Sequence, residues 1–351
     1  MWNCCCNVNV TTSKEIVDWS SKRRVAVHVA VDSPSANMPL SARLKPSGTR
    51  IVNLVAPQLW AWAPWRLGKV KRTSDVLLCL LPFEERWFRE RGATAKYVGH
   101  PVLSKVVDPE RVAEERAQLA PGGPRIVLLP GSRSGEVRAN GRLLTEVFSL
   151  IQNRHRAAVC VVVASSDANA RLFRELLGGR LPPAMHVVVA NRDGVLEAAI
   201  EWSELALCVS GTVSLDCARQ AKPMIGVYKT SWFEAIGAKF ILRAPYKLLP
   251  NIIAGKEVVP EFVPYAGGAG RVAETALGMI GDGRKTARMR EELRQVAASF
   301  QGRDPARLAS AVIARAAQGK GLSNAELDKI ERAVYSESGQ GAAPEDGLGS
   351  E

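Results

Sequence analysis

The stretch LLPGSRSGEV, from Leu128 to Val137, is the strongest indication of the fold, because an apolar strand runs directly into a Gly-Ser-Arg turn. Gly131 lets a backbone approach an anion closely, Ser132 is suited to cap a following helix, and Arg133 carries a permanently charged fork of donors that fits a diphosphate. A helix beginning here would add the partial positive charge of its unpaired amides. The turn therefore predicts a phosphate site, although an ordinary capped helix uses the same residue types.

The turn belongs to a block in which short apolar strands alternate with helices. We expect strands over residues 125–129, 158–164, 186–190, 205–210 and 223–227, and helices over residues 139–154, 169–177, 195–202 and 213–220. Such alternation is typical of a parallel, doubly wound α/β sheet. Two final helices are expected within residues 285–317, broken near Arg303, Asp304 and Pro305.

A shorter block of the same kind precedes it, with strands expected over residues 25–31, 51–55, 76–81 and 96–98 and a helix over residues 83–91. We therefore predict two Rossmann-like α/β domains, residues 25–106 being an incomplete first one and residues 107–284 a complete second one, followed by helices over residues 285–319. Residues 1–24 are predicted to be a mobile leader, unrelated to the rest of the fold, in which a short helix could form. Residues 320–351, acidic and rich in Gly, Ser and Ala, are predicted to be disordered.

Charge and composition limit the class of partner. The chain has 351 residues, of which 46% are hydrophobic and 23% charged, as expected of a globular protein of about two domains. Its formal charge is +12, and because residues 320–351 hold seven acids and three bases, the rest of the chain carries +16. This charge predicts an anionic partner: nucleic acid, acidic lipid headgroups or a phosphorylated substrate.

The cysteines indicate a reducing compartment. Four of them lie in apolar or helical contexts and are predicted to be small core residues: Cys79, Cys160, Cys208 and Cys217. Residues 4–6 are three further cysteines without a partner at metal spacing, so no metal site is predicted. The sequence shows no signal-peptide pattern and no apolar run of the ~20 residues that span a bilayer, so a soluble or peripheral protein is expected.

Two further polar clusters follow strands. Ser210, Gly211 and Thr212 form a second strand-to-helix turn, with Asp216 near the start of its helix. Ligands bind beyond the carboxyl ends of strands in open α/β sheets, so this turn and the Gly-Ser-Arg turn are predicted to hold the phosphates and ribose of one nucleotide, unless both are ordinary capped helices. Neither turn matches the Walker or GxGxxG pattern, which argues against ATPase and NAD-dependent activities.

Asp32 ends the first strand of the first block. A carboxylate in this position can act as a general base towards an attacking hydroxyl. The alternative is that Asp32 caps a turn or helix, which is the more common role of Asp before Ser-Pro.

Residues 58–72, QLWAWAPWRLGKVKR, interleave three tryptophans with four bases. This mixture suits a membrane interface or stacking on single-stranded nucleic acid, and it is equally compatible with buried tryptophans beside a solvated basic face. His100, at the junction of the two blocks, either faces a cleft or is structural.

Seven motifs, in order, resemble the lipid-A-disaccharide synthase family over about residues 25–317. They are VDSPSAN (31–37), PQLWAW (57–62), LLPFE (80–84), VGHPV (98–102), LLPGSRSGEV (128–137), SGTVSLDC (210–217) and LPNIIAGKEVVPEF (249–262). The resemblance implies an inverting glycosyltransferase of the two-Rossmann-domain GT-B architecture at the cytoplasmic face of the inner membrane. Such enzymes join UDP-2,3-diacylglucosamine to 2,3-diacylglucosamine 1-phosphate, and they form a β-1,6-linked disaccharide and UDP.

The resemblance also implies the site residues. Asp32 falls on the family's catalytic aspartate, the base for the attacking 6-hydroxyl, and Arg133 falls on the arginine that meets the UDP phosphates. The implied nucleotide side comprises Gly131, Ser132, Glu136, Ser210, Gly211, Thr212, Asp216 and Asn251. The implied membrane or acceptor side comprises Trp60, Trp62, Trp65, Arg66 and His100. No cofactor or metal is implied, and the expected partners are the two lipid substrates, membrane lipids and a second copy of the chain, but not nucleic acid.

The sequence departs from the family pattern in three places. The family's glycine-rich SGExSGD segment is not found before Val25, Asp216 stands where the family usually has Glu, and Ser35-Ala36 replace an Asp-Phe pair. Two alternatives therefore stay open: an impaired homologue that binds UDP but lacks the acceptor site, and a transferase for another UDP-sugar and lipid acceptor.

Overall fold

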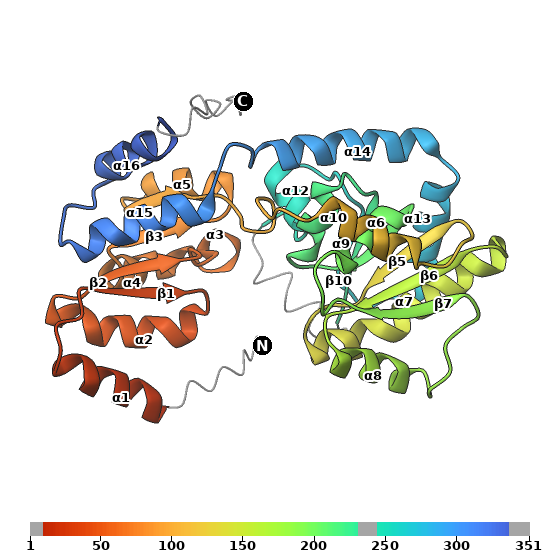
Figure 1. Cartoon of the computed structure of the whole chain (residues 1–351), viewed down its shortest axis with the longest axis horizontal. Helices are drawn as coiled ribbons and strands as arrows, with labels where there is room; N and C mark the ends of the chain where they lie inside the picture. Colours follow the sequence, from red (N-terminus) through yellow and green to blue (C-terminus); the bar gives the residue numbers. More distant parts are fainter. Residues whose placement is uncertain (1–9, 231–243, 337–351) are drawn as a thin grey trace. The chain divides into compact units, whose positions relative to one another are not determined.

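The structure is a computed structural model that describes residues 10–230 and 244–336. The chain forms two compact units, the first comprising Met1–Ser104 with Phe300–Glu351 and the second comprising Lys105–Ser299. Each unit is built on one parallel sheet (Figure 1). The predicted α/β class is confirmed.

The second unit contains a six-stranded sheet in the order β10-β9-β8-β5-β6-β7, with every pair parallel. Its strands are β5 (Arg125–Leu129), β6 (Val159–Ala164), β7 (Met185–Val189), β8 (Leu205–Val209), β9 (Met224–Lys229) and β10 (Glu261–Tyr265). Counted from β7, this is the Rossmann order 3-2-1-4-5-6, and the direction of winding reverses between β5 and β8. The sequence did not predict β10, because its proline obscures the strand pattern and fits only an edge position.

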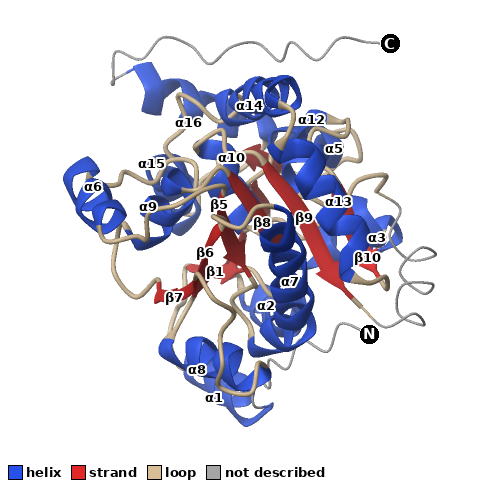
Figure 2. Cartoon of the chain, turned by 90° about the vertical axis from the view of Figure 1, so that its right-hand side faces the viewer, coloured by secondary structure: helices blue, strands red, loops and turns tan. Residues whose placement is uncertain are grey.

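Helices cover both faces of this sheet. They are α6 (Pro109–Ala117), α7 (Ser134–Arg154), α8 (Asp167–Leu176), α9 (Val195–Trp202), α10 (Val213–Arg219), α12 (Leu249–Ala254), α13 (Ala269–Ile280) and α14 (Gly283–Ala298). The long helix α7 packs against α8 and α13 and crosses β8 and β9 (Figure 2). The predicted core cysteines Cys160, Cys208 and Cys217 are fully buried here, as Cys79 is in the first unit.

The first unit contains four parallel strands in sequence order. They are β1 (Val27–Val31), β2 (Arg50–Leu54), β3 (Val76–Cys79) and β4 (Ala95–Tyr97). In Figure 1, α2 (Pro34–Leu44) lies below this sheet and α15 (Pro305–Ala317) lies above it. The remaining elements are α1 (Val10–Ser21), α3 (Leu59–Trp62), α4 (Leu67–Thr73), α5 (Pro82–Arg89), α16 (Asn324–Ser336) and the 3-10 turns η1 (Lys45–Ser47) and η2 (Pro64–Arg66).

Two predictions about the ends of the fold are wrong within the described residues. The expected mobile leader contains α1, whose Val17 packs against the buried side chains of Leu40 and Leu44. The expected disordered tail contains α16, whose Leu327 is fully buried in a cluster with Leu308 of α15. The helices predicted as one carboxyl-terminal block are divided, since α14 belongs to the second unit and α15 to the first.

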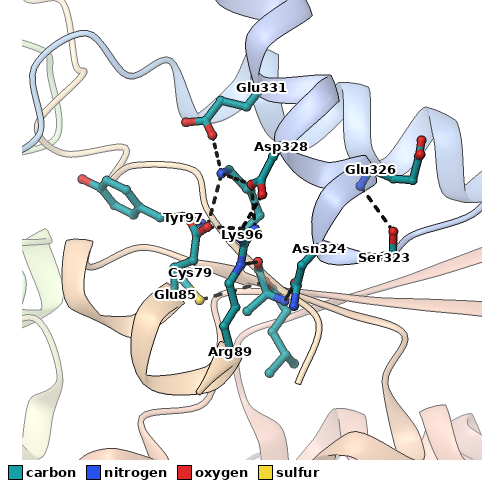
Figure 3. A network of polar contacts seen from close by, with 12 residues as sticks. Cys79, Glu85, Arg89, Lys96, Tyr97, Ser323, Asn324, Glu326, Asp328 and Glu331 are labelled. Atoms are coloured by element: carbon teal, nitrogen blue, oxygen red, sulfur yellow. Dashed lines mark hydrogen bonds and ion pairs between the residues drawn. The ribbon is translucent and has the colours of Figure 1, made fainter. Parts of the chain in front are cut away.

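A network of charges holds α16 against the first sheet (Figure 3). The ammonium of Lys96 on β4 is 4% exposed and lies 3.2 Å from Glu85 Oε1 and 2.9 Å from Asp328 Oδ1, and it also pairs with Glu331. The guanidinium of Arg89 donates two hydrogen bonds to Asp328, at 3.1 and 2.8 Å. These bonds, with the charge of Lys96, lower the pKa of Asp328 to about 2, so this carboxylate stays charged at physiological pH.

Candidate functional site

The Gly-Ser-Arg turn follows β5 in the second unit. Gly131 has φ of 106°, in the region that favours glycine. A Cβ atom at this position would lie 2.6 Å from the Cβ and Oε2 atoms of Glu136. Only glycine fits this turn, because both the backbone conformation and the space exclude a larger residue.

The carboxylate of Glu136 occupies the donors that a phosphate would use. Its Oε2 accepts hydrogen bonds from the backbone N–H groups of Ser132 at 2.9 Å and of Arg133 at 3.2 Å, and its Oε1 lies 2.8 Å from Arg133 Nη1. A phosphate that used the same donors would have to displace this carboxylate, because two anions sharing them would repel each other. Arg133, not Ser132, is the N-cap of α7, so the prediction that Ser132 caps this helix is wrong.

Two asparagines that the sequence did not single out fix this turn. Asn169 Nδ2, at the start of α8, donates to the Ser132 carbonyl at 2.8 Å. Asn140, fully buried in α7, donates to the Glu136 carbonyl at 2.9 Å and accepts from the backbone N–H of Lys229 at 2.7 Å. A buried polar residue within a helix, one turn after the motif, is the signal by which Asn140 could have been found.

The second turn lies beside the first. Strands β5 and β8 pair in parallel with Leu129 opposite Cys208, so the turns that follow them meet at the same sheet edge, where the winding reverses. Gly211 and Thr212 are exposed there, and Ser210 Oγ donates to the Lys247 carbonyl at 3.3 Å. The structure therefore brings the two predicted turns together.

Asp216 lies in the first turn of α10 and is 8% exposed. Burial raises its pKa to about 6; the charge of Arg219 acts against this shift and that of Glu197 adds to it. Such a carboxyl titrates close to neutrality, which an exposed aspartate does not do.

Asn251 does not face a ligand. Its side chain is fully buried, Nδ2 donates to the Val259 carbonyl at 2.8 Å and to Glu261 Oε2 at 3.0 Å, and Oδ1 accepts from the backbone N–H groups of Val258 and Val259, both at 2.8 Å. These four bonds use its whole hydrogen-bonding capacity. The prediction that Asn251 contacts the nucleotide is corrected: it joins α12 to β10.

Asp32 in the first unit has an unusual backbone. Asp32 and the following Ser33 have φ of 48° and 42°, a left-handed conformation that costs side-chain-bearing residues about 1–2 kcal/mol each. Asn37 Nδ2 holds the turn by donating to the carbonyls of Val31 at 3.0 Å and Asp32 at 2.7 Å. Asp32 is exposed, and among the described residues its carboxylate accepts no hydrogen bond. The alternative that Asp32 caps the helix is therefore wrong, since Ser33 is the N-cap of α2.

The tryptophans of residues 58–72 divide into two groups. Trp60 is structural, because its Nε1 donates to Glu84 Oε1 at 3.0 Å and its ring meets Phe83 edge to face at 4.9 Å. Burial raises the pKa of Glu84 to about 7, against hydrogen bonds from Trp60 and the backbone. Trp62 and Trp65 are 37% and 67% exposed. The predicted membrane-facing role is wrong for Trp60, whose contact joins the motifs PQLWAW and LLPFE inside the unit.

His100 has a structural environment. Its Nδ1 accepts the backbone N–H of Val102 at 3.2 Å, and its ring lies 6.5 Å from that of Phe300. Burial lowers the pKa of His100 to about 4, so the ring is neutral at physiological pH. This supports the structural alternative over a charged group in a cleft.

Residues 10–230 and 244–336 contain no group of three or more His, Cys, Asp or Glu side chains that could hold a metal ion. No helix in these ranges is long and apolar enough to cross a membrane. Residues 4–6, the amino-terminal cysteines, lie outside the described residues.

Two parallel α/β units, one of them in Rossmann order with paired turns at its switch point, define the GT-B class of glycosyltransferases and related epimerases. The fold is similar to that of UDP-GlcNAc 2-epimerase from Neisseria meningitidis bound to UDP-GlcNAc, with a TM-score of 0.56 and 10% identity over 80% of this chain and 75% of that one. An S. aureus MnaA-UDP co-structure gives a TM-score of 0.54 and 10% identity, covering 81% of this chain and 74% of that one.

The family model for lipid-A-disaccharide synthetase matches residues 10–313. Lipid-A-disaccharide synthase from Solibacter usitatus is 33% identical over 304 residues, which are 85% of this chain and 77% of that one. The enzymes of Idiomarina loihiensis and Pseudomonas paraeruginosa are 32% and 30% identical, covering 71% and 74% of this chain and 65% and 68% of their own. The chain belongs to the lipid-A-disaccharide synthetase family and is a glycosyltransferase of lipid A biosynthesis. The match begins at residue 10, so the expectation that residues 1–24 are unrelated to the family is wrong from α1 onward.

Proposed function

We propose that the chain transfers 2,3-diacylglucosamine, with inversion, from UDP-2,3-diacylglucosamine to the 6-hydroxyl of 2,3-diacylglucosamine 1-phosphate. The products are the β-1,6-linked disaccharide phosphate and UDP. The observation that carries the proposal is the pair of turns at the switch point of the second sheet, where backbone amides and a guanidinium already hold a carboxylate.

The leaving diphosphate takes the place of the Glu136 carboxylate. Once Glu136 turns away, the amides of Ser132 and Arg133 and the Arg133 guanidinium neutralise the negative charge that develops as the C1–O bond to the diphosphate breaks. Gly211 and Thr212 contact the nucleotide from the neighbouring turn, and Asp216 accepts hydrogen bonds from the ribose hydroxyls.

Asp32 acts as the general base. Its carboxylate takes the proton of the acceptor 6-hydroxyl while the oxygen forms a bond to C1 on the face opposite the leaving group, which inverts that carbon. The left-handed turn, held by Asn37, presents this carboxylate to solvent without an internal hydrogen bond in the described part of the chain. Strained backbone conformations of this kind are common at functional sites.

The exposed tryptophans support a location at the cytoplasmic face of the inner membrane as part of this proposal. Trp62 and Trp65 are exposed, and the guanidinium of Arg66 lies over the Trp62 ring at 5.2 Å from its centroid. Exposed bases follow at Lys69 and Lys71. Indoles favour headgroup depth and cations favour anionic lipid, so this segment suits an acidic membrane surface.

The test is release of UDP by the full chain given both lipid substrates. Arg133→Ala removes the charged donor of the diphosphate and is expected to lower kcat by about 10²–10³-fold. Arg138→Ala, a change at an exposed arginine one turn further along α7, is the matched control and should leave kcat unchanged. Asp32→Asn should lower kcat with little change in the KM for the UDP-sugar.

The proposal fails if the unaltered chain releases no UDP above the Arg133→Ala level. UDP binding without turnover would favour the alternative of a homologue that binds UDP but does not use the acceptor. Turnover with a different UDP-sugar and lipid acceptor only would favour the second alternative.

A further inference from the structure

A pocket of about 800 Å³ opens in the first unit at the carboxyl ends of β1, β2 and β3. Its floor is apolar and is formed by Val31, Leu54, Val55 and Leu80. Val31 is 55% exposed, and Val55 has φ of 72°, a conformation that a β-branched residue adopts only under strain. A volume of this size is typical of small-molecule sites, and the next residue after Val31 is the proposed base Asp32.

The opposite wall comes from the carboxyl-terminal part of the chain. Arg303, Asp304 and Arg307 line it from the start of α15, and Tyr335 lines it from α16. The guanidinium of Arg303 pairs with Glu331 of α16 and lies 5.8 Å from the ring centroid of Tyr335. The Asp304 carboxylate accepts the backbone N–H of Arg307 at 3.0 Å, which turns this acid towards its own helix.

The wall is held close to the sheet. The Tyr335 hydroxyl accepts the backbone N–H of Asp304 at 3.1 Å, which ties α16 to α15 at the rim. A Cβ atom at Gly99, in the motif VGHPV, would lie 2.9 Å from Arg303 Cβ, so this glycine permits the close approach of the arginine. These contacts fix the wall of the pocket relative to the sheet of the first unit.

We propose that this pocket binds the lipid acceptor, with an acyl chain against the strand ends and the phosphate at Arg307, and that Tyr335 of α16 contributes to acceptor affinity. The inference rests on the proposed function and adds the acceptor subsite to it. An apolar floor with the Arg307 guanidinium at one rim complements an amphiphile that carries a phosphate. The family match ends at residue 313, so Tyr335 and Glu331 lie beyond the part of the chain that the family model covers.

The first experiment distinguishes the contribution of the alkyl chain from that of the phosphate. The full chain of the protein is titrated calorimetrically with three probes, each below its critical micelle concentration. Dodecyl phosphate has both an alkyl chain and a phosphate group. Dodecyl maltoside has only the alkyl chain, and glucose 1-phosphate has only the phosphate group. Dodecyl phosphate is expected to bind at least about tenfold more tightly than either of the others, because charge-assisted hydrogen bonds add to apolar burial. Equal binding of dodecyl phosphate and dodecyl maltoside would overturn the assignment of the phosphate to Arg307.

Variants then locate the binding. Ala306, an exposed pocket residue at the start of α15, is changed to Trp to fill the space, and Ala325→Trp, at an exposed position of α16 outside the pocket, is the matched control. Ala306→Trp should weaken both dodecyl probes at least about tenfold, whereas Ala325→Trp should not. Arg307→Gln should weaken only dodecyl phosphate, with Arg332→Gln of exposed α16 as its control. Unchanged binding of dodecyl phosphate to Ala306→Trp would overturn the proposal.

Turnover distinguishes this inference from the proposed function. Ala306→Trp and Tyr335→Ala should raise the KM for the acceptor at least about tenfold and leave the KM for the UDP-sugar unchanged. If turnover occurs but these variants have the acceptor KM of the unaltered chain, the pocket assignment is wrong and the function stands. If dodecyl phosphate binds in the pocket and no UDP is ever released, the function is wrong and the binding site for an acylated phosphate stands.

Discussion

The two units place their proposed site residues at equivalent sheet edges but shape the turns in opposite ways. In the second unit, Gly131 adopts the left-handed conformation at little cost, and the amides that it exposes hold Glu136. In the first unit, Asp32, Ser33 and Val55 adopt such conformations with full side chains. A glycine turn exposes backbone donors, whereas a strained turn directs a side chain. The contrast fits a donor site that binds phosphate through the backbone and an acceptor site that acts through one carboxylate.

The units also differ in what holds them together. The second has a large apolar core in which β5, β6 and β8 are almost wholly buried. The first joins α16 to β4 through Lys96 and three carboxylates, with Arg89 at their edge. A buried charge network is stable only while every charge has a partner.

The largest expected effect comes from breaking this network. Lys96→Met leaves Glu85, Asp328 and Glu331 close together without their central cation, and it should lower the free energy of unfolding of the first unit by about 3–5 kcal/mol. Hydrogen exchange measured along the chain should show faster exchange in α16 and β4 and unchanged exchange in β5. Lys329→Met, which removes an exposed i,i+3 pair with Glu326, is the control and should cost less than about 1 kcal/mol. Equal protection of α16 in both variants would contradict the comparison.

The next effect tests the glycine turn of the second unit. Gly131→Ala introduces a Cβ at a φ of 106° and 2.6 Å from Glu136, so unfolding should become easier by about 1–2 kcal/mol and UDP should bind about tenfold more weakly. Gly135→Ala is the matched control, because nothing lies within 4 Å of a Cβ there and the residue is in the first turn of α7. It should be neutral or stabilising. If both variants bind UDP equally well, the turn does not hold the phosphate.

A third effect tests the strained turn of the first unit. Asn37→Ala removes the two hydrogen bonds that hold the carbonyls of Val31 and Asp32, which should cost about 1 kcal/mol of stability. Because Asn37 is a positioning residue, Asn37→Ala should lower kcat about tenfold and leave the KM for the UDP-sugar almost unchanged. Ser35→Ala, at an exposed position in the first turn of α2, is the control. An unchanged kcat would show that Asp32 does not depend on this turn.

Local sequence pattern predicted the parts of the fold that local residues determine. Strand β5 and helix α9 have the predicted bounds, because continuous apolar runs and helical spacing identify buried elements. Helix α16 was missed, and α1 was foreseen only as a short helix in a mobile leader, because their residues are mostly polar and their stability depends on tertiary contacts. The decisive partners of α16 are Lys96 and Arg89, which lie more than two hundred residues away in the sequence.

For the candidate sites, too, local sequence did not reveal the tertiary partners of each side chain. Motif spacing brought the two turns of the second unit to one sheet edge, as the pairing of β5 with β8 confirms. Motif membership did not reveal what each side chain does. Asn251 and Trp60 stand in matching motifs, yet both are used in internal hydrogen bonds whose partners are set by the folded backbone. The pocket beside Val31 was not predictable because its far wall comes from α15 and α16.

The smallest expected effect is a pH dependence in the second unit. Burial raises the pKa of Asp216 from 3.8 to about 6, so the folded chain favours the protonated carboxyl, and the stability this contributes is full below pH 3.8 and lost as the pH rises through about 6. The affinity for UDP should instead rise with pH, because only the ionised Asp216 carboxylate accepts hydrogen bonds from both ribose hydroxyls. The β-phosphate of UDP titrates in the same range, so the informative quantity is the difference between the unaltered chain and Asp216→Asn. Titrations with UDP from pH 5 to pH 7.5 should show an affinity that rises about threefold more in the unaltered chain. Parallel profiles would mean that Asp216 is a buried structural carboxyl and that the ribose is held by other groups.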